Sequence, residues 1–164
     1  MAEGDFIVLA DHDDRLTPNA LFECAKKLNE NRSCDVLYSD EDKLDMDGDE
    51  LFDPHFKPDF NPDLLCANNY ICHLFVVKRS LALKLGGQDP AYDGAQDYDF
   101  IFRCTENAEK IVHVAKILYH WRVHQASTAD NPSSKLYAFD AGKRAIEAHL
   151  ARIGAKAEVS HTKD

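Results

Sequence analysis

The chain has 164 residues, of which 45% are hydrophobic and 29% charged, and its formal net charge is −10. These values fit a single globular domain over residues 1–164 and exclude a disordered chain. A net negative charge without a basic patch argues against nucleic acid as a partner. No apolar run approaches the roughly 20 residues of a membrane helix, so we expect a soluble piece.

The five cysteines are scattered and never spaced CxxC: Cys24, Cys34, Cys66, Cys72 and Cys104. An odd number without paired spacing argues against a disulfide framework or a zinc site. We expect most of them to be small core residues and the protein to be cytoplasmic. For the full-length protein, the alternative is a peripheral location at the inner face of the membrane.

The first predicted element is a buried strand over residues 6–10, which ends in the cluster Asp11-His12-Asp13-Asp14. Thr17 is the expected N-cap of an amphipathic helix over 18–29, with Pro18 at its first position. Ligands usually bind at the carboxyl edge of an α/β sheet, and two carboxylates spaced i and i+2 can reach one divalent ion. A solvated turn before a helix is the alternative.

A short strand is expected at 36–38, followed by an acidic stretch that is reminiscent of a calcium-binding EF-hand loop. Its glycine, Gly48, falls in the wrong place, because position six of such a loop would be Glu50. Asp47-Gly48 therefore favours a turn. Residues 53–63, rich in proline and aromatic residues, are expected to form an irregular loop.

The second half predicts a strand at 74–77 and a short helix at 80–85 that stops at Gly86-Gly87. Further elements are expected in this order: a helix at 97–104, strands at 111–114 and 117–121, and a long helix at 133–152. Alternating strands and helices indicate an α/β fold. Because the first element is already a buried strand, and no glycine-rich phosphate turn follows any strand, we expect the chain to start mid-domain.

Two further positions are candidates for chemistry. Asp97 would lie in the first turn of its helix, where an aspartate is also an ordinary complement to the helix dipole. His120, Arg122 and His124 share one face of a strand by alternation. An arginine and a histidine there suit phosphate oxygens and a metal, and a polar strand face is the alternative.

The order of these segments is more specific than any one of them. It runs Asp11-His12-Asp13-Asp14, Tyr38 to Lys43, Phe56 to Phe60, Asn68 to Ile71, Gln96 to Asp99 and Tyr119 to His124. Over almost the whole chain this set resembles glycosyltransferase family 2, with the GT-A fold, as found in bacterial cell-surface polysaccharide synthesis.

The resemblance implies a partial GT-A fold, a mixed sheet flanked by helices that lacks the N-terminal nucleotide-binding strands. It implies a UDP- or dTDP-sugar donor, a saccharide or lipid-linked acceptor, and Mn²⁺ or Mg²⁺ as cofactor. Transfer would invert the anomeric centre. Without the first strands one apolar sheet edge would be exposed, which invites a homodimer.

The resemblance also assigns residues to roles. Asp11 and Asp13 correspond to the DxD motif, in which the first carboxylate supports the nucleotide and the second binds the metal. His124 would complete the metal site, and Arg122 would lie near the diphosphate.

Asp97 matches the catalytic base, although Gln96 stands where the family usually has glutamate. The region from Phe56 and Lys57 to Asn69 and Tyr70 would lie toward the acceptor.

Two alternative hypotheses for the function of the chain remain. In a haloacid-dehalogenase-type phosphohydrolase Asp11 would be the nucleophile and Asp13 the acid/base, but Arg15 stands where that pattern has threonine or valine. Alternatively, the chain is a binding or assembly module without catalysis of its own.

Overall fold

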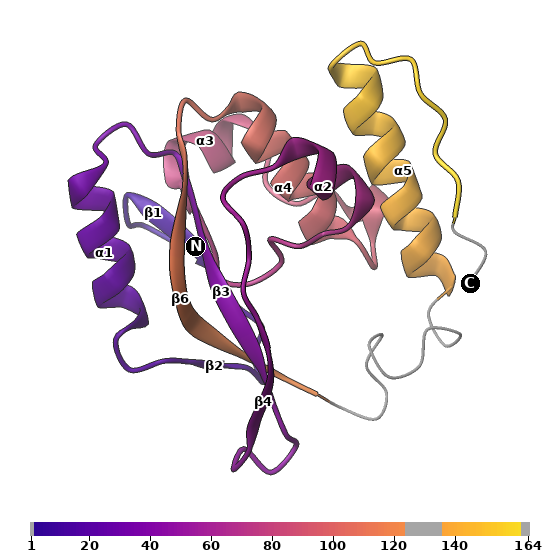
Figure 1. Cartoon of the computed structure of the whole chain (residues 1–164). Helices are drawn as coiled ribbons and strands as arrows, with labels where there is room; N and C mark the ends of the chain where they lie inside the picture. Colours follow the sequence, from indigo (N-terminus) through magenta and orange to yellow (C-terminus); the bar gives the residue numbers. More distant parts are fainter. Residues whose placement is uncertain (1, 124–135, 162–164) are drawn as a thin grey trace.

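A computed structural model describes residues 2–123 and 136–161. Its centre is a mixed sheet in the order β1-β5-β3-β6-β2, with β4 paired to the second half of β3 (Figure 1). β3 and β6 are parallel, and the other pairs are antiparallel. The strands are β1 (Phe6–Leu9), β2 (Arg15–Leu16), β3 (Val36–Leu44), β4 (Leu51–His55), β5 (Phe75–Lys78) and β6 (Ile111–Arg122).

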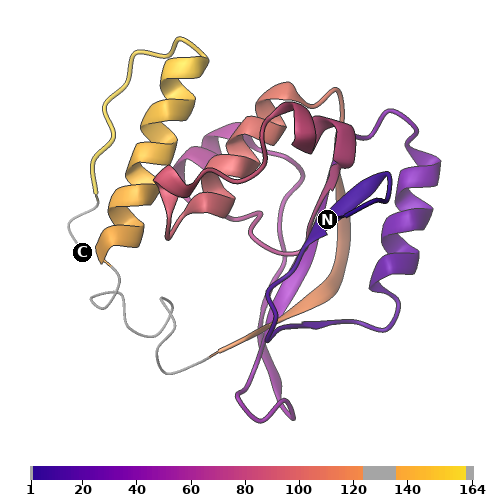
Figure 2. The same cartoon turned by 180° about the vertical axis from the view of Figure 1, so that it is seen from behind.

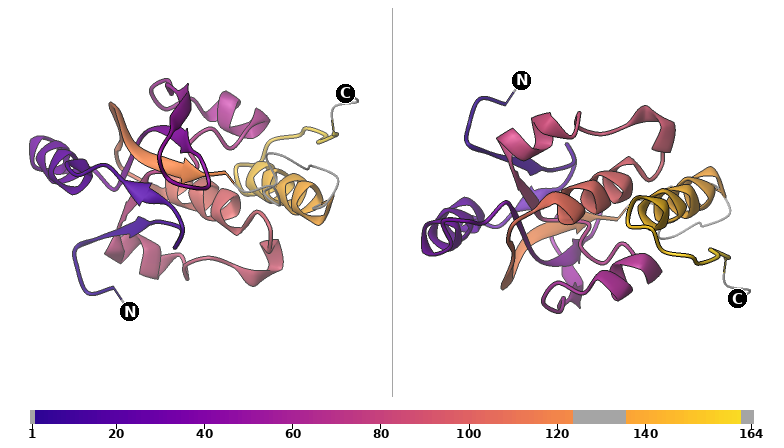
Figure 3. Two further views of the ribbon diagram at one scale, coloured as in Figure 1. Left: turned by 90° about the horizontal axis from the view of Figure 1, so that it is seen from below. Right: turned by 90° about the horizontal axis from the view of Figure 1, so that it is seen from above.

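Helices cover both faces of this sheet. They are α1 (Ala20–Glu30), α2 (Pro62–Ala67), α3 (Arg79–Lys84), α4 (Gln96–Asn107) and α5 (Leu136–Arg152), with a 3₁₀ turn η1 (Pro90–Tyr92). Strand alternation sends Val36 and Tyr38 into the core under α4, and Leu37 into the core under α1. α1 and α5 therefore lie on opposite sides of the sheet, and α5 packs on α4 (Figure 3). This confirms the predicted α/β fold with a mixed sheet between helices.

Four predicted elements are confirmed within two residues at both ends, namely the strands at 6–10 and 74–77 and the helices at 18–29 and 80–85, whereas α4 runs three residues beyond its expected end at 104. Gly86 and Gly87 follow α3 with φ of 81° and 73°, as expected of helix-stopping glycines. The final helix is described from Leu136, and the expected residues 133–135 lie outside the described part. α1 begins at Ala20 with Asn19 as N-cap, so the predicted cap at Thr17 is wrong. No described helix is long and apolar enough to cross a membrane.

β3 is three times as long as the strand expected at 36–38, because buried partners compensate its polar second half. Asp40 Oδ1 lies 2.8 Å from Nε2 of His113 in β6, and Asp42 Oδ1 lies 2.5 Å from Nδ1 of His120. The parallel partner is also continuous, so the two expected strands at 111–114 and 117–121 are one strand, β6, with a local register shift. The polar residues after Tyr38 predicted that the strand would end there, but pairing with β6 extends β3 to Leu44.

Residues 53–63 are not an irregular loop throughout. Residues 53–55 belong to β4, and α2 begins at Pro62, where the Asn61 side chain accepts a hydrogen bond from the Leu64 amide. The turn at Asp47-Gly48 is confirmed, with Gly48 at φ 83°. The carboxylate of Asp45 accepts the amides of Gly48, Asp49 and Glu50, so it caps this turn and does not follow the geometry of an EF-hand loop.

β1 is an edge strand, paired on one side with β5 (Figure 2). The sequence predicted a buried strand here, but the residues of β1 are only half-buried. All five cysteines are free, as predicted, and Cys24, Cys34 and Cys104 are buried. The loop that follows β1 carries the acidic cluster into the centre of the candidate site.

Candidate active site

The acidic loop after β1 is fixed from β6. The Tyr119 hydroxyl donates to Asp14 Oδ2 at 2.5 Å and accepts the Asp11 amide at 2.9 Å. The Arg122 amide donates to Asp14 Oδ1 at 2.7 Å. Burial raises the pKa of Asp14, although the hydrogen bonds from Tyr119 and Arg122 oppose that rise. Asp14 is thus turned inward, whereas the side chain of Asp11 is 63% exposed.

His73 completes this corner of the molecule. Its ring stacks on Tyr119 with centroids 4.6 Å apart, and its Nε2 lies 3.7 Å from Asp11 Oδ2. Nδ1 of His73 is buried and has no hydrogen-bond partner among the described residues. The sequence offered no signal for this residue, which stands alone just before β5, because only the tertiary fold brings it beside the acidic loop.

These residues form a candidate metal site. Asp11, Asp14 and His73 each offer one ligand atom, and the three atoms lie within 4.8 Å of one another. Asp13, the expected metal ligand, is not in this described group, and its side chain lies 3.8 Å from His12 Nδ1. His124 lies outside the described residues. Metal binding by Asp13 and His124 therefore stays a prediction.

Arg122 holds the acidic loop against the β3–β4 hairpin. Its guanidinium donates to the carbonyls of Asp13 at 2.7 Å, Met46 at 2.9 Å and Asp45 at 3.1 Å. Arg122 lies beside the acidic cluster as expected. Its hydrogen bonds to backbone carbonyls stabilise the acidic loop and the hairpin. A contact with diphosphate stays a prediction.

Asp97 lies in the first turn of α4, as predicted. Its Oδ2 accepts a 2.9 Å hydrogen bond from Asn69 Nδ2, which joins two residues that the sequence placed in separate regions. Asp99, by contrast, is buried and bonded to Arg103 at 2.7 Å, so it stabilises the fold. Of the two aspartates in the first turn of α4, Asp97 is the one that lines a cleft.

One cleft of about 360 Å³ connects the two candidate centres. It is bordered by Asp11 and His73 on one side, by Asp97 on another and by Trp121 of β6. Residues from the start and the middle of the chain thus meet in a single site. The geometry suits binding of a charged group at the acidic loop and removal of a proton at Asp97.

The four residues expected near an acceptor separate in the structure. Phe56 is 70% exposed, and Asn69 lies beside Asp97. Lys57 and Tyr70 are buried, and the Tyr70 hydroxyl accepts the Asn61 amide at 2.9 Å. Lys57 and Tyr70 therefore support this region from the interior and do not present their side chains to a ligand.

Lys57 is the centre of a buried network behind the site. Its Nζ donates to Glu41 Oε2 at 3.2 Å, to the Ile71 carbonyl at 2.7 Å and to the His73 carbonyl. Glu41 Oε2 also accepts the His73 amide at 3.2 Å. Burial lowers the pKa of Lys57, and the charge of Glu41 opposes that change. This network holds the segment that carries His73.

No known family profile matches the sequence. The chain is 43% identical over 158 residues to an uncharacterized protein, y4gI, of Sinorhizobium fredii, covering 95% of this chain and 17% of that protein. It is 40% identical over 157 residues to the O-antigen biosynthesis protein RfbC of Myxococcus xanthus, covering 96% and 12%. The chain thus spans less than a fifth of the length of either relative.

A solved structure shows the same fold. Residues 1–349 of TarS from S. aureus superpose with a TM-score of 0.63 at 20% identity, covering 96% of this chain and 43% of that one. TarS in complex with UDP gives a TM-score of 0.62 at 21% identity. A more distant relative, 29% identical over 128 residues, is an uncharacterized glycosyltransferase of Methanocaldococcus jannaschii, with 75% of this chain and 43% of that protein covered.

Proposed function

We propose that this chain is part of a glycosyltransferase that transfers a sugar from a nucleoside-diphosphate sugar to an acceptor hydroxyl during polysaccharide synthesis. The observation that carries the proposal is the single cleft that joins Asp11 and His73 to Asp97. The name of the M. xanthus relative and the UDP complex of TarS support the substrate class. The donor is a UDP- or dTDP-sugar, and the acceptor is a saccharide or a lipid-linked saccharide.

A divalent cation fits the acidic loop. Asp11 and Asp14 offer carboxylate oxygens and His73 offers an imidazole nitrogen, a donor set that suits Mn²⁺ and, through its oxygens, Mg²⁺. The position of His73 Nε2, 3.7 Å from Asp11 Oδ2, supports such a role. The resemblance adds Asp13 and His124 as further ligands. When bound, the ion would offset negative charge on the departing diphosphate.

Asp97 is proposed as the base that takes the proton of the acceptor hydroxyl. Asp97 lies in the first turn of α4, and Asn69 fixes one of its carboxylate oxygens. Direct displacement by that hydroxyl forms the new glycosidic bond as the bond to the diphosphate breaks, which inverts the anomeric centre. Arg122 keeps the acidic loop in place during this step.

The first test is calorimetric titration of the chain with UDP, with and without Mn²⁺. We expect binding that requires Mn²⁺ and is weakened in Asp11→Ala, His73→Ala and Asp13→Ala. Unchanged binding in His73→Ala with loss in Asp13→Ala would move the metal site to the ligands implied by the resemblance. In the full-length protein, Asp97→Asn should abolish transfer but keep UDP binding, and intact transfer would refute the base assignment.

The alternative is a binding or assembly module, because the chain spans only a small part of its relatives. It predicts self-association without UDP binding, and the free edge of β1 is where two copies would pair in a homodimer. Sedimentation of the chain at several concentrations distinguishes this outcome. A phosphohydrolase of the haloacid-dehalogenase type would instead hydrolyse p-nitrophenyl phosphate.

A further inference from the structure

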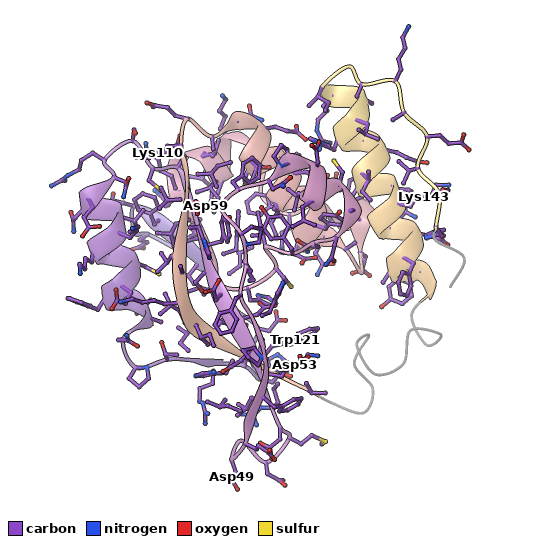
Figure 4. The ribbon with its side chains drawn as sticks, in the orientation of Figure 1. Asp49, Asp53, Asp59, Lys110, Trp121 and Lys143 are labelled. Atoms are coloured by element: carbon purple, nitrogen blue, oxygen red, sulfur yellow. The ribbon has the colours of Figure 1, made fainter. Side chains whose placement is uncertain are left out.

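A second cleft, of about 430 Å³, adjoins the first. It lies between β4, the end of β6 and the segment after α2, and the two clefts share Cys72 and Trp121. Its wall also includes Asn69, whose amide holds Asp97. Figure 4 shows Trp121 and Asp53 where β6 passes the hairpin, and both residues line this cleft. A molecule bound here would thus lie next to the proposed base.

Trp121 gives this cleft an aromatic wall. It is the only tryptophan in the chain, and it is partly exposed on β6, in register with Lys43 of β3. The negatively charged face of an indole attracts groups with positive edges, such as the C–H bonds on the apolar face of a sugar ring. Packing against the core under α1 holds the ring in place, so little side-chain freedom is lost when a ligand stacks on it.

The rest of the wall suits hydroxyl groups. The amides of Asn68 and Asn69 offer donors and acceptors, and the half-exposed ring of His55 offers another nitrogen. Sugar hydroxyls both donate and accept hydrogen bonds, so they match this mixture.

Charge in the cleft disfavours an anionic ligand. Its carboxylates already have cationic or imidazole partners, since Glu41 bonds Lys57, Asp42 bonds His120 and Asp53 bonds Lys43. Lys43 is the lysine of the described lining, and its Nζ lies 2.5 Å from Asp53. Among the described residues, the cleft therefore has no lysine or arginine left over to neutralise a phosphate or a uronate.

We propose that this second cleft is the acceptor subsite and that it takes an uncharged sugar ring stacked on Trp121. The inference rests on the proposed function and adds to it the acceptor's charge class and the residue that recognises it. A ring on Trp121 can present a hydroxyl to Asp97 through the junction of the two clefts. Asn69 would then have two tasks, to hold Asp97 and to line the acceptor subsite.

The single tryptophan makes the test direct. The chain is titrated, up to roughly 100 mM, with methyl glucoside, methyl rhamnoside and N-acetylglucosamine, a range that includes affinities weaker than millimolar. Indole fluorescence should change saturably with at least one of them. Glucuronic acid and glucose 6-phosphate should bind at least about tenfold more weakly than methyl glucoside or give no change. No saturable change with any neutral sugar, or tighter binding of the anionic ones, would overturn the proposal.

Variants separate stacking from folding. By calorimetry, Trp121→Phe should keep most of the affinity, whereas Trp121→Ala should lose roughly tenfold. Phe22→Ala, which removes a 67% exposed aromatic on α1, is the matched control and should bind like the wild type. Equal affinity of Trp121→Ala and the wild type would refute the subsite. UDP binding with Mn²⁺ is measured on the same variants, so failure here is distinguishable from failure of the proposed function.

Discussion

Asn69 Nδ2 and Asp97 Oδ2 are joined by a 2.9 Å hydrogen bond that links the segment after α2 to the first turn of α4. The bond leaves the second oxygen of Asp97 as the one that can approach an acceptor hydroxyl. It makes Asn69 a positioning residue for the proposed base.

Asn69→Ala in the full-length protein should lower kcat by about 10- to 100-fold, because a hydrogen bond to a charged group contributes roughly 1.5–3 kcal/mol. The KM for the donor should change little, since the acidic loop is untouched. Steady-state kinetics with varied donor measure both quantities. A rise in donor KM with unchanged kcat would contradict the positioning role.

Lys57→Met should lower the free energy of unfolding by about 3–5 kcal/mol, because it removes the buried lysine that is paired with the buried carboxylate of Glu41. Chemical denaturation measures this change. Lys116→Met, which removes an exposed lysine paired with Glu23, is the control and should leave stability nearly unchanged.

Adding Glu41→Gln to Lys57→Met should recover part of that loss, since the two side chains act as one pair. Strictly additive losses would show that the pair is not coupled.

Glu41 should also contribute to acid unfolding. Burial raises its pKa, but hydrogen bonding from His55 and the charge of Lys57 outweigh burial, and the net pKa is lowered below its usual 4.5. A lowered folded-state pKa gives stability that is complete above about pH 4.5 and is lost as the pH falls toward the folded value. Glu41→Gln should be less stable at neutral pH and should lose stability less steeply below pH 4.5 than the wild type. Equal slopes in pH-dependent denaturation would argue against this contribution.

His73→Ala should weaken Mn²⁺ binding by at least about tenfold, because it removes the one nitrogen ligand of the described group. Mn²⁺ titration followed by electron paramagnetic resonance measures the affinity. His12→Ala is the matched control, since that side chain is 98% exposed in the same neighbourhood. If the two variants bound Mn²⁺ equally well, His73 would not be a ligand.

The sequence by itself determined the α/β class, the place of most helices and strands, and two of the candidate residues. Local signals suffice there, because an apolar run that ends in Asp11 and a helix that opens at Asp97 are visible without long-range contacts. The glycines after α3 and at Gly48 are equally local, since each has the positive φ that glycine adopts without a steric penalty.

Only the tertiary structure decided the length of β3, because His113, His120 and Lys57 come from distant segments to partner its buried carboxylates. It likewise placed His73 beside Asp11 and joined Asn69 to Asp97. A lone histidine or asparagine carries no periodic or capping signal in the chain. Its role depends on which side chains the folded sheet brings within hydrogen-bonding distance, and that is set by packing over the whole domain.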